Sequence, residues 1–438
     1  MSGGVMRPDM DTTAEELYRQ AFALSRAGRQ QEAEDRLRAA AGKGLPQACY
    51  TLALNRLQHK GSAAAAEACR WLEQGRCRDL APAAQLLAVL RLGGWDGAPA
   101  PETALDILFS LAARGAPGFL RQIAMAALLE LDEAAAIATA GRLLGEAARR
   151  GDILASLLHA RLSSEGVLSR AEERPSIAAE ALARLRMAGH PAAALAYREG
   201  GVAAPRPEPL SCALREEMEK LREPLARALA SPPAVPAGEE VVGKQGYRVR
   251  VIRRIWPVAA CDYVAAIALP LLRPSTVLDP VSGQMRLHPV RRSHHATLFP
   301  WDQDLVTWLL ERRLTALVGQ PPAHGEMLCV LQYPPGGEYR PHLDALTAEE
   351  GKSGEELKRS GQRTHTVLVR LAERFAGGET HFPVAELSFA LAAGDALVFP
   401  NVDEKGKPDP RSLHAGLPVR DGVKWMATKW IRAQPYCW

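Results

Sequence analysis

The chain has 438 residues, of which 47% are hydrophobic and 24% are charged. At roughly 100–200 residues per domain, this length predicts two or three domains, and the composition excludes a disordered chain, a collagen-like chain and a small disulfide scaffold. The formal net charge is only +4, so we expect neither nucleic acid nor a membrane surface as a partner.

The cysteines and the hydropathy pattern predict a compartment. The seven cysteines are scattered and form no CxxC pair, which favours buried free thiols in a reducing environment over a zinc knuckle or a disulfide framework. The N-terminal sequence MSGGVMRPDMDTTAEE has no apolar core of a secretory signal. No uninterrupted apolar run reaches the roughly 18 residues of a transmembrane helix. We therefore expect a soluble cytoplasmic protein.

Residues 1–205 are predicted to form an α-helical repeat domain. Apolar residues recur at helical spacing, and five Ala-rich segments each end in a glycine that is followed by another such segment: Gly44, Gly75, Gly115, Gly151 and Gly189. The gaps of 31, 40, 36 and 38 residues are typical of a solenoid with two helices per unit, and glycine suits the left-handed position that ends a helix. Residues 14–200 resemble tetratricopeptide-like repeats of the Sel-one class. Simple helical hairpins in a bundle are the alternative.

The pattern changes in the second half of the chain. Residues 206–240 are predicted to be a Pro-rich linker containing one connecting helix, CALREEMEKLREPLARALA. Residues 241–438 contain short Val-, Ile- and Leu-rich segments bounded by turn residues, which predict strands: YRVRVIRRIW, EMLCVLQY, HTVLVRL and ALVFP. Between them, LVTWLLERRLTALVG predicts one amphipathic helix that covers a sheet. The fold class is therefore α + β and multidomain, with a C-terminal sandwich or barrel such as a jelly roll.

The last hundred residues contain a candidate metal site. His342 and Asp344 are separated by one residue, and side chains at that spacing point to the same face of a strand. His414, which lies 70 residues after Asp344, is the candidate third ligand. Two histidines and one carboxylate leave coordination positions open, as in non-haem Fe(II) oxygenases, whereas zinc would favour a closed tetrahedral site or a bound hydroxide. Lys424, ten residues further on, requires an anionic partner if it is buried in a barrel.

The complete pattern resembles the Fe(II)/2-oxoglutarate dioxygenase superfamily, and within it the prolyl 4-hydroxylase branch. The resemblance covers residues 243–434 and is carried by STVLDPVSGQ followed by RRS, EMLCVLQYPPGGEYRPHLD, GQRTHTVLVRL, GGETHFP, GDALVFPN, SLHAGLPV and GVKWMATKW. It implies a double-stranded β-helix fold of the jelly-roll or cupin type and a hydroxylase that uses Fe(II), 2-oxoglutarate and O2, with ascorbate as a possible stimulant. The implied metal ligands are His342, Asp344 and His414. The implied co-substrate contacts are Lys424 with the C5 carboxylate, Tyr333, Thr380 and Thr366.

Two positions depart from the branch. Arg370 stands where the family often has Tyr, and His381 stands where an apolar residue is common. Together with Arg291, Arg292 and Arg363, these residues are candidates for binding an anionic group on the substrate. Asp344 retains the carboxylate that related halogenases lack, which favours hydroxylation over halogenation.

The resemblance implies a proline-like cyclic imino acid as substrate. Pro-rich peptides usually dock on aromatic-lined grooves, and the only tyrosines of the helical half are Tyr18, Tyr50 and Tyr197. A free amino acid instead needs a cation for its carboxylate, and arginine candidates are present. We therefore favour free proline or pipecolic acid in specialised metabolism, a preference that a surface groove lined by aromatic residues would reverse.

Other interpretations stay open. One alternative substrate is a peptidyl proline held by the helical repeats. A more remote alternative is a non-catalytic helical-repeat interaction protein, which iron binding would distinguish from an enzyme. A homodimer through the helical domain is a further option.

Overall fold

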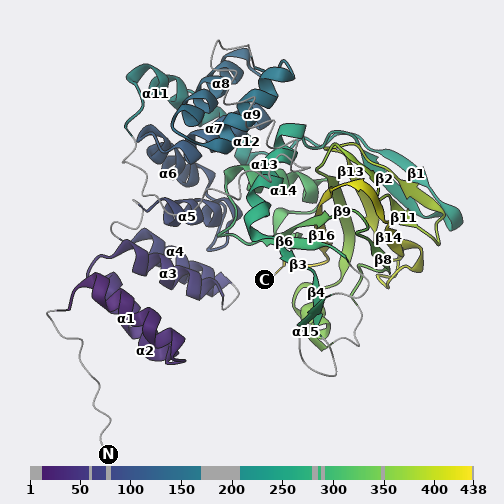
Figure 1. Ribbon diagram of the computed structural model, residues 1–438, viewed down its shortest axis with the longest axis horizontal. Coiled ribbons are helices and arrows are strands. Elements are labelled where there is room, and N and C mark those ends of the chain that lie inside the picture. The colour runs from purple at the N-terminus through teal and green to yellow at the C-terminus, as the bar shows by residue number, and fades with distance from the viewer. Residues whose placement is uncertain are drawn as a thin grey trace, which may run out of the picture. The chain divides into compact units, whose positions relative to one another are not determined.

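The computed structural model describes residues 12–58, 62–74, 80–168, 208–278, 285–287, 292–346 and 351–436 (Figure 1). Contacts divide the chain into two compact units, with the boundary between Leu111 and Ala112. This boundary lies well before residue 205, where composition predicts the helical domain to end. The predicted functional division into 1–205, 206–240 and 241–438 stays a prediction.

The first unit is entirely α-helical in the residues described. Its helices are α1 (Ala14–Arg26), α2 (Gln30–Gly42), α3 (Pro46–Leu57), α4 (Ser62–Glu73) and α5 (Ala81–Gly93). Each helix packs against the next one along the chain, and the buried positions are mostly leucine and alanine, such as Leu17, Ala40, Ala48 and Leu52. The small alanine side chains allow the helices to approach closely. The prediction of repeated helix pairs is confirmed here.

The second unit contains further helices that pack on the C-terminal part of the chain. They are α7 (Pro117–Glu130), α8 (Ala134–Arg149), α9 (Ile153–Ser164), α11 (Cys212–Glu219), α12 (Arg222–Ala230), α13 (Val258–Ala268) and α14 (Leu305–Ala316), while α6 (Pro101–Ala113) crosses the boundary. Helix α7 contacts α12 and α14, and α9 contacts α13. These contacts explain why α7–α9 belong to the second unit, although their sequence continues the repeat pattern.

The predicted connecting helix is two helices, which is a correction. Helix α11 ends at Glu219 and α12 begins at Arg222. Pro224 accounts for the break, because it lacks the N–H that would bond to the carbonyl of Lys220 and its ring would clash with that carbonyl.

Glycines end the helices as the sequence predicts. Positive φ angles of 84°, 84° and 90° occur at Gly44, Gly115 and Gly151, which follow α2, α6 and α8. After α8, the N–H of Asp152 donates to the carbonyl of Ala147, the bond of a Schellman motif that only a left-handed residue allows. Gly75 and Gly189 lie outside the described residues.

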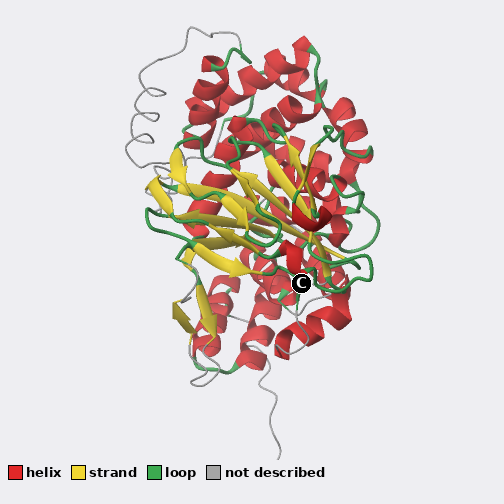
Figure 2. Ribbon diagram, turned by 90° about the vertical axis from the view of Figure 1, so that its right-hand side faces the viewer, coloured by secondary structure: helices red, strands yellow, loops and turns green. Residues whose placement is uncertain are grey.

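The C-terminal part is built from antiparallel sheets, shown as yellow arrows in Figure 2. The larger sheet has the order β1 (Glu239–Val242), β2 (Arg248–Ile252), β13 (Ala396–Pro400), β9 (Arg363–Arg370), β16 (Lys424–Arg432), β7 (Leu328–Tyr333), β6 (His294–Leu298) and β3 (Arg273–Pro274). The second sheet has the order β12 (Leu387–Phe389), β11 (Thr380–Phe382), β14 (His414–Gly416) and β8 (Tyr339–His342). Two short pairs are β10 (Phe375–Gly377) with β15 (Val419–Gly422), and β4 (Thr276–Leu278) with β5 (Met285–Leu287).

One hydrophobic core joins the two main sheets. It contains Tyr247, Val249 and Phe399 from the larger sheet and its flank, together with Phe382 from the smaller sheet. The four predicted strand segments form β2, β7, β9 and β13, and the predicted amphipathic helix forms α14. The double-stranded β-helix fold is confirmed.

Strand β16 has two faces with different surroundings. One face lines a cavity between the sheets with Lys424, Met426, Thr428 and Trp430. The intervening residues lie on the opposite face, as strand alternation requires. There Lys429 forms an ion pair with Glu311 of α14, which packs on this face of the sheet (Figure 1).

Two sequence-based expectations concern thiols and membranes. Cys49, Cys69, Cys261 and Cys329 are buried thiols outside any disulfide, as predicted, whereas Cys212 is exposed. None of the helices in the described ranges combines the length and the apolar character needed to span a bilayer.

The ion pair behind the sheet gives a stability prediction. The side chains of Lys429 and Glu311 are only 4% and 10% exposed. Lys429→Met leaves the carboxylate of Glu311 buried without its cation, so we expect the free energy of unfolding to fall by about 3–5 kcal/mol in urea denaturation. The double variant Lys429→Met/Glu311→Gln removes both charges together and should recover most of this loss.

The matched control is the exposed pair Lys244–Glu386, whose side chains are 57% and 62% exposed. Lys244→Met should change the free energy of unfolding by less than about 1 kcal/mol. Equal losses in the single and double variants of the buried pair would contradict the interpretation.

Candidate active site

The three predicted metal ligands meet at the edge of the smaller sheet. His342 is the last residue of β8, His414 is the first residue of β14, and the pairing of these strands places the two histidines opposite each other. Asp344 follows two residues after β8. The possible ligand atoms all lie within 4.8 Å of one another, and each carboxylate oxygen of Asp344 is 3.7 Å from the Nε2 of one histidine.

Backbone carbonyls fix the orientation of both imidazoles. The Nδ1 of His342 lies 2.9 Å from the carbonyl oxygen of Arg340, and the Nδ1 of His414 lies 3.0 Å from that of Ser412. A carbonyl can only accept, so each Nδ1 donates, and this orientation turns each Nε2 towards Asp344. Two imidazoles and one carboxylate therefore converge on a common point. This donor set fits a divalent metal ion with open coordination positions.

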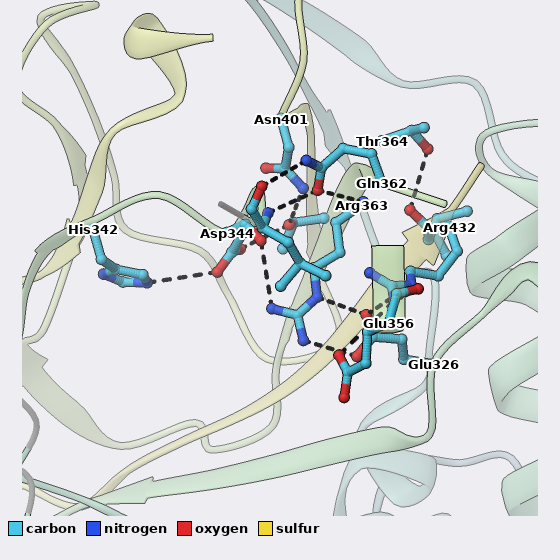
Figure 3. A network of polar contacts seen from close by, with 12 residues as sticks. Glu326, His342, Asp344, Glu356, Gln362, Arg363, Thr364, Asn401 and Arg432 are labelled. Carbon is cyan, nitrogen blue, oxygen red and sulfur yellow. Dashed lines mark hydrogen bonds and ion pairs between the residues drawn. The ribbon is translucent and has the colours of Figure 1, made fainter. Parts of the chain in front are cut away.

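The surroundings of Asp344 favour its ionised form. Its side chain is buried, with 6% of the residue exposed. Burial by itself raises the pKa of Asp344, but His414, His342, Arg363 and a hydrogen bond from Thr366 together hold it below the usual value. The hydroxyl of Thr366 donates to Oδ2 at 2.7 Å. Figure 3 shows His342 and Arg363 on either side of Asp344.

A cavity of about 210 Å³ connects the metal ligands with Lys424. Its walls are formed by Leu331, Tyr333, Tyr339, His342, Leu343, Asp344, Arg363, Leu368, Thr380, His414, Ala415, Gly416, Lys424, Met426, Thr428 and Trp430. The walls come from both sheets, and strand β16 alone supplies four of these residues through its inward face.

Lys424 is a buried cation with few partners. It is 4% exposed, and its Nζ donates to the carbonyl of Gly378 at 2.7 Å. In the described part of the chain, no carboxylate lies within 4 Å of this Nζ. Burial and, to a smaller extent, Arg370 lower the pKa of Lys424 while Glu379 raises it, and the net value is about 8. A buried ammonium in this state fits the carboxylate of a bound anion.

Gly378, whose carbonyl accepts from Lys424, leaves space for the lysine side chain. Gly378 has a φ of +67°, and a Cβ at this position would lie 2.9 Å from the Cδ of Lys424. A side chain at position 378 would therefore push the lysine away from the cavity.

Two of the three other predicted co-substrate contacts lie at the cavity. Tyr333 pairs with Lys424 across β7 and β16, and the lysine Nζ is 5.1 Å from the centre of its ring. Thr380 lines the cavity from β11. Thr366 is not part of the cavity wall, because its hydroxyl is directed to the carboxylate of Asp344. Its contact is with a metal ligand and not with the co-substrate pocket.

The residues predicted to bind an anionic substrate group are mostly engaged elsewhere. The guanidinium of Arg370 donates to the carbonyls of Ala372, Glu373 and Leu391, which corrects the prediction for this residue. Arg363 does line the cavity, but its Nε and Nη2 donate to the carboxylate of Glu326 at 2.6 and 2.8 Å.

Two of the remaining three candidates are not brought to the cavity. Arg292 is exposed and is not part of the cavity wall. His381 follows Thr380 on the same strand, and strand alternation turns it to the opposite face. Arg291 lies outside the described residues.

Several residues of the site were not predicted from the sequence. Tyr339 stacks on His342 with 3.5 Å between ring centroids and lines the cavity. Trp430 also lines the cavity. It lies six residues after Lys424, and because this spacing is even, strand alternation predicts that the two side chains share a face. Glu326, the partner of Arg363, and Asn401, the partner of Thr366, gave no recognisable sequence pattern.

Comparisons with known proteins agree with this geometry. The family model described as the 2OG-Fe(II) oxygenase superfamily matches residues 328–432. Prolyl 4-hydroxylase 1 of Arabidopsis thaliana is 34% identical over 199 residues, which cover 42% of this chain and 69% of the relative. The chain spans about two thirds of the length of the curated plant relatives that it matches.

Two solved structures are also similar to this chain. The viral collagen prolyl hydroxylase of Paramecium bursaria Chlorella virus-1 is 24% identical, with coverage of 44% of this chain and 99% of the viral chain and a TM-score of 0.34. A Sel1 repeat protein from Oxalobacter formigenes is 16% identical, with coverage of 50% and 90% and a TM-score of 0.32.

The span shared with the family contains all three convergent metal ligands and the buried lysine. Because a relative that is one third identical is matched over more than two thirds of its length, this chain belongs to the prolyl 4-hydroxylase family of Fe(II)- and 2-oxoglutarate-dependent oxygenases.

Proposed function

We propose that this chain hydroxylates proline residues within a peptide or a protein. The observation that carries the proposal is a single cavity in which three convergent metal ligands and a buried ammonium line the same space. Fe(II) would be held by His342, Asp344 and His414. The 2-oxoglutarate would be held by Lys424, Tyr333 and Thr380.

Each part of the site then has a defined role. When bound, iron and 2-oxoglutarate supply the oxidation of an unactivated C–H bond by dioxygen, with release of succinate and carbon dioxide. The backbone carbonyls that accept from Nδ1 of the two histidines turn both Nε2 atoms towards the position that the metal would take. Lys424 neutralises the distal carboxylate of the co-substrate, and the surrounding apolar walls keep bulk water away from the reacting atoms.

The charges of the cavity support a substrate residue within a chain over a free amino acid. A free amino acid brings a carboxylate, which needs a cation or several donors when it is buried. Among the described wall residues, the Lys and Arg side chains are Lys424 and Arg363. The first is needed by the co-substrate and the second is paired with Glu326. A prolyl residue inside a peptide is neutral and needs no such partner.

The aromatic walls support the same conclusion. Tyr339 and Trp430 line the cavity, and the guanidinium of Arg363 lies 4.0 Å from the centre of the Trp430 ring. Flat aromatic surfaces of this kind suit the apolar ring of proline. The relatives also carry the name prolyl 4-hydroxylase, so peptidyl proline replaces free proline as the proposed substrate.

The substrate assay tests this proposal directly. Succinate release would be measured with Fe(II), 2-oxoglutarate, ascorbate and oxygen, in the presence of a proline-rich peptide with blocked termini, of free proline or of pipecolic acid. We expect the peptide to stimulate succinate release and to gain about 16 mass units, as the insertion of one oxygen atom requires. The same peptide with alanine in place of proline is the control. Stimulation by a free imino acid, without stimulation by the peptide, would return the preference to the free amino acid.

The metal site is tested by removing its carboxylate. Asp344→Ala should abolish hydroxylation and weaken Mn(II) binding by more than about 100-fold in calorimetric titration, because a directly bound ligand contributes more than an indirect partner. Asp421→Ala changes an exposed aspartate and should leave both quantities unchanged. Undiminished metal binding by Asp344→Ala would remove this residue from the site.

The lowered pKa of Lys424 predicts a pH dependence of co-substrate binding. Only the charged ammonium attracts a carboxylate, and burial, Arg370 and Glu379 together place its pKa at about 8. The Kd for 2-oxoglutarate, measured anaerobically, should therefore be constant below pH 8 and should rise about tenfold per pH unit above it. Lys424→Arg keeps its charge throughout this range, so its Kd should be independent of pH even if it is larger. A flat profile in the unaltered enzyme would exclude the proposed role of Lys424.

A further inference from the structure

A chain of hydrogen bonds leads from the metal-ligating carboxylate into the protein interior (Figure 3). The hydroxyl of Thr366 donates to Oδ2 of Asp344 at 2.7 Å, and Nδ2 of Asn401 donates to the Thr366 oxygen at 2.8 Å. Thr366 and Asn401 are both 0% exposed. The chain therefore operates where bulk water does not compete for its hydrogen bonds.

The direction of each hydrogen bond in this chain is determined by chemistry. An ionised carboxylate can only accept, so the single proton of the Thr366 hydroxyl must point towards Asp344. The threonine oxygen is then an acceptor on its other side, and Asn401 has to present its N–H group. If the amide of Asn401 were flipped, two acceptor oxygens would face each other. The amide therefore holds the rotatable hydroxyl in the one orientation that serves the carboxylate.

The environment of the Asn401 side-chain oxygen is energetically unfavourable. Oδ1 of Asn401 is buried and has no hydrogen-bond partner in the part of the chain that the structure describes. A buried acceptor without a partner is destabilising. An apolar side chain would avoid this cost, so packing alone does not account for an asparagine at position 401.

Backbone hydrogen bonds fix the position of Asn401 and connect it with the loop that precedes His414. Its N–H donates to the carbonyl of Thr364 at 2.8 Å, and its carbonyl accepts from the N–H of Asp409 at 3.0 Å. The carbonyl of Asp409 accepts from the hydroxyl of Ser412, and the carbonyl of Ser412 accepts from Nδ1 of His414. The amide that orients Thr366 is thus attached to the same loop that orients His414.

We infer that Asn401 is a positioning residue for the metal site and that it acts through Thr366 on Asp344. This inference rests on the proposed metal site. The bond from Thr366 to Oδ2 fixes the orientation of the carboxylate, whose two oxygens each lie 3.7 Å from Nε2 of one histidine. In this orientation Asp344 would hold the metal together with His342 and His414.

The test measures metal affinity in the absence of turnover. Asn401→Ala, Thr366→Val and the double variant would be prepared in the full chain, freed of metal and titrated calorimetrically with Mn(II). Each single variant should bind Mn(II) about 10–100-fold more weakly than the unaltered protein, the effect expected for partners of metal ligands. Because both residues act through one hydroxyl, the double variant should bind no more weakly than the weaker single variant. Thr366→Ser keeps the hydroxyl and should keep most of the affinity.

The controls separate this inference from the proposed function and from misfolding. Thr315→Val changes another buried threonine, on α14, whose hydroxyl donates to the carbonyl of Arg312, and should leave Mn(II) affinity unchanged. The visible absorption of the anaerobic Fe(II)–2-oxoglutarate complex gives a second measure, which should differ from that of the unaltered protein in Asn401→Ala but not in Thr366→Ser. If Asn401→Ala does not fold, Thr366→Val and Thr366→Ser still give the comparison. Failure of the unaltered protein to bind Mn(II) would overturn the metal site itself, whereas unaltered affinity in Asn401→Ala, or additive losses in the double variant, would overturn only the positioning role.

Discussion

The negative charge of Asp344 is the constraint on which the rest of the site depends. A carboxylate taken out of water prefers to bind a proton, and this one stays ionised because two imidazoles, a guanidinium and a hydroxyl surround it. These four partners come from three separate strands. The pairing of β8 with β14 supplies the histidines, and β9 supplies Thr366 and Arg363. The sheets therefore have to assemble before the charge can be accommodated, so the metal site and the fold form together.

Two buried lysines on strand β16 differ in the groups that neutralise their charges. Lys424 and Lys429 are five residues apart on β16, and this odd spacing turns them to opposite faces of the sheet. Both are almost fully buried. Lys429 is neutralised by Glu311, so its charge is satisfied within the protein. Lys424 faces the cavity and has a carbonyl as its hydrogen-bond partner, which leaves its charge to be neutralised by a bound anion.

The charges around the cavity also limit the substrate. Arginines near the site suggested an anionic substrate when only the sequence was considered. In the structure, Arg370 is used by three backbone carbonyls and Arg363 by Glu326. Their charges serve to order the loops and strands around the cavity. What remains on the cavity wall is largely aromatic and aliphatic, and this surface suits a neutral ring within a peptide.

The sequence by itself determined the elements and residues whose constraints are local or repeat at a fixed spacing. The alternation of β strands predicted that His342 and Asp344 share a face, the glycines predicted the ends of α2, α6 and α8, and the long-range pattern added His414 and Lys424. The partners of these residues could not be predicted, because hydrogen bonds such as that from Asn401 to Thr366 join segments 35 residues apart and depend on strand order. The same is true of the unit boundary, since the grouping of α7–α9 with α12–α14 follows from contacts across the fold and not from composition. Only the tertiary structure decides which buried charges neutralise each other, because that depends on distances between residues that are remote in the sequence.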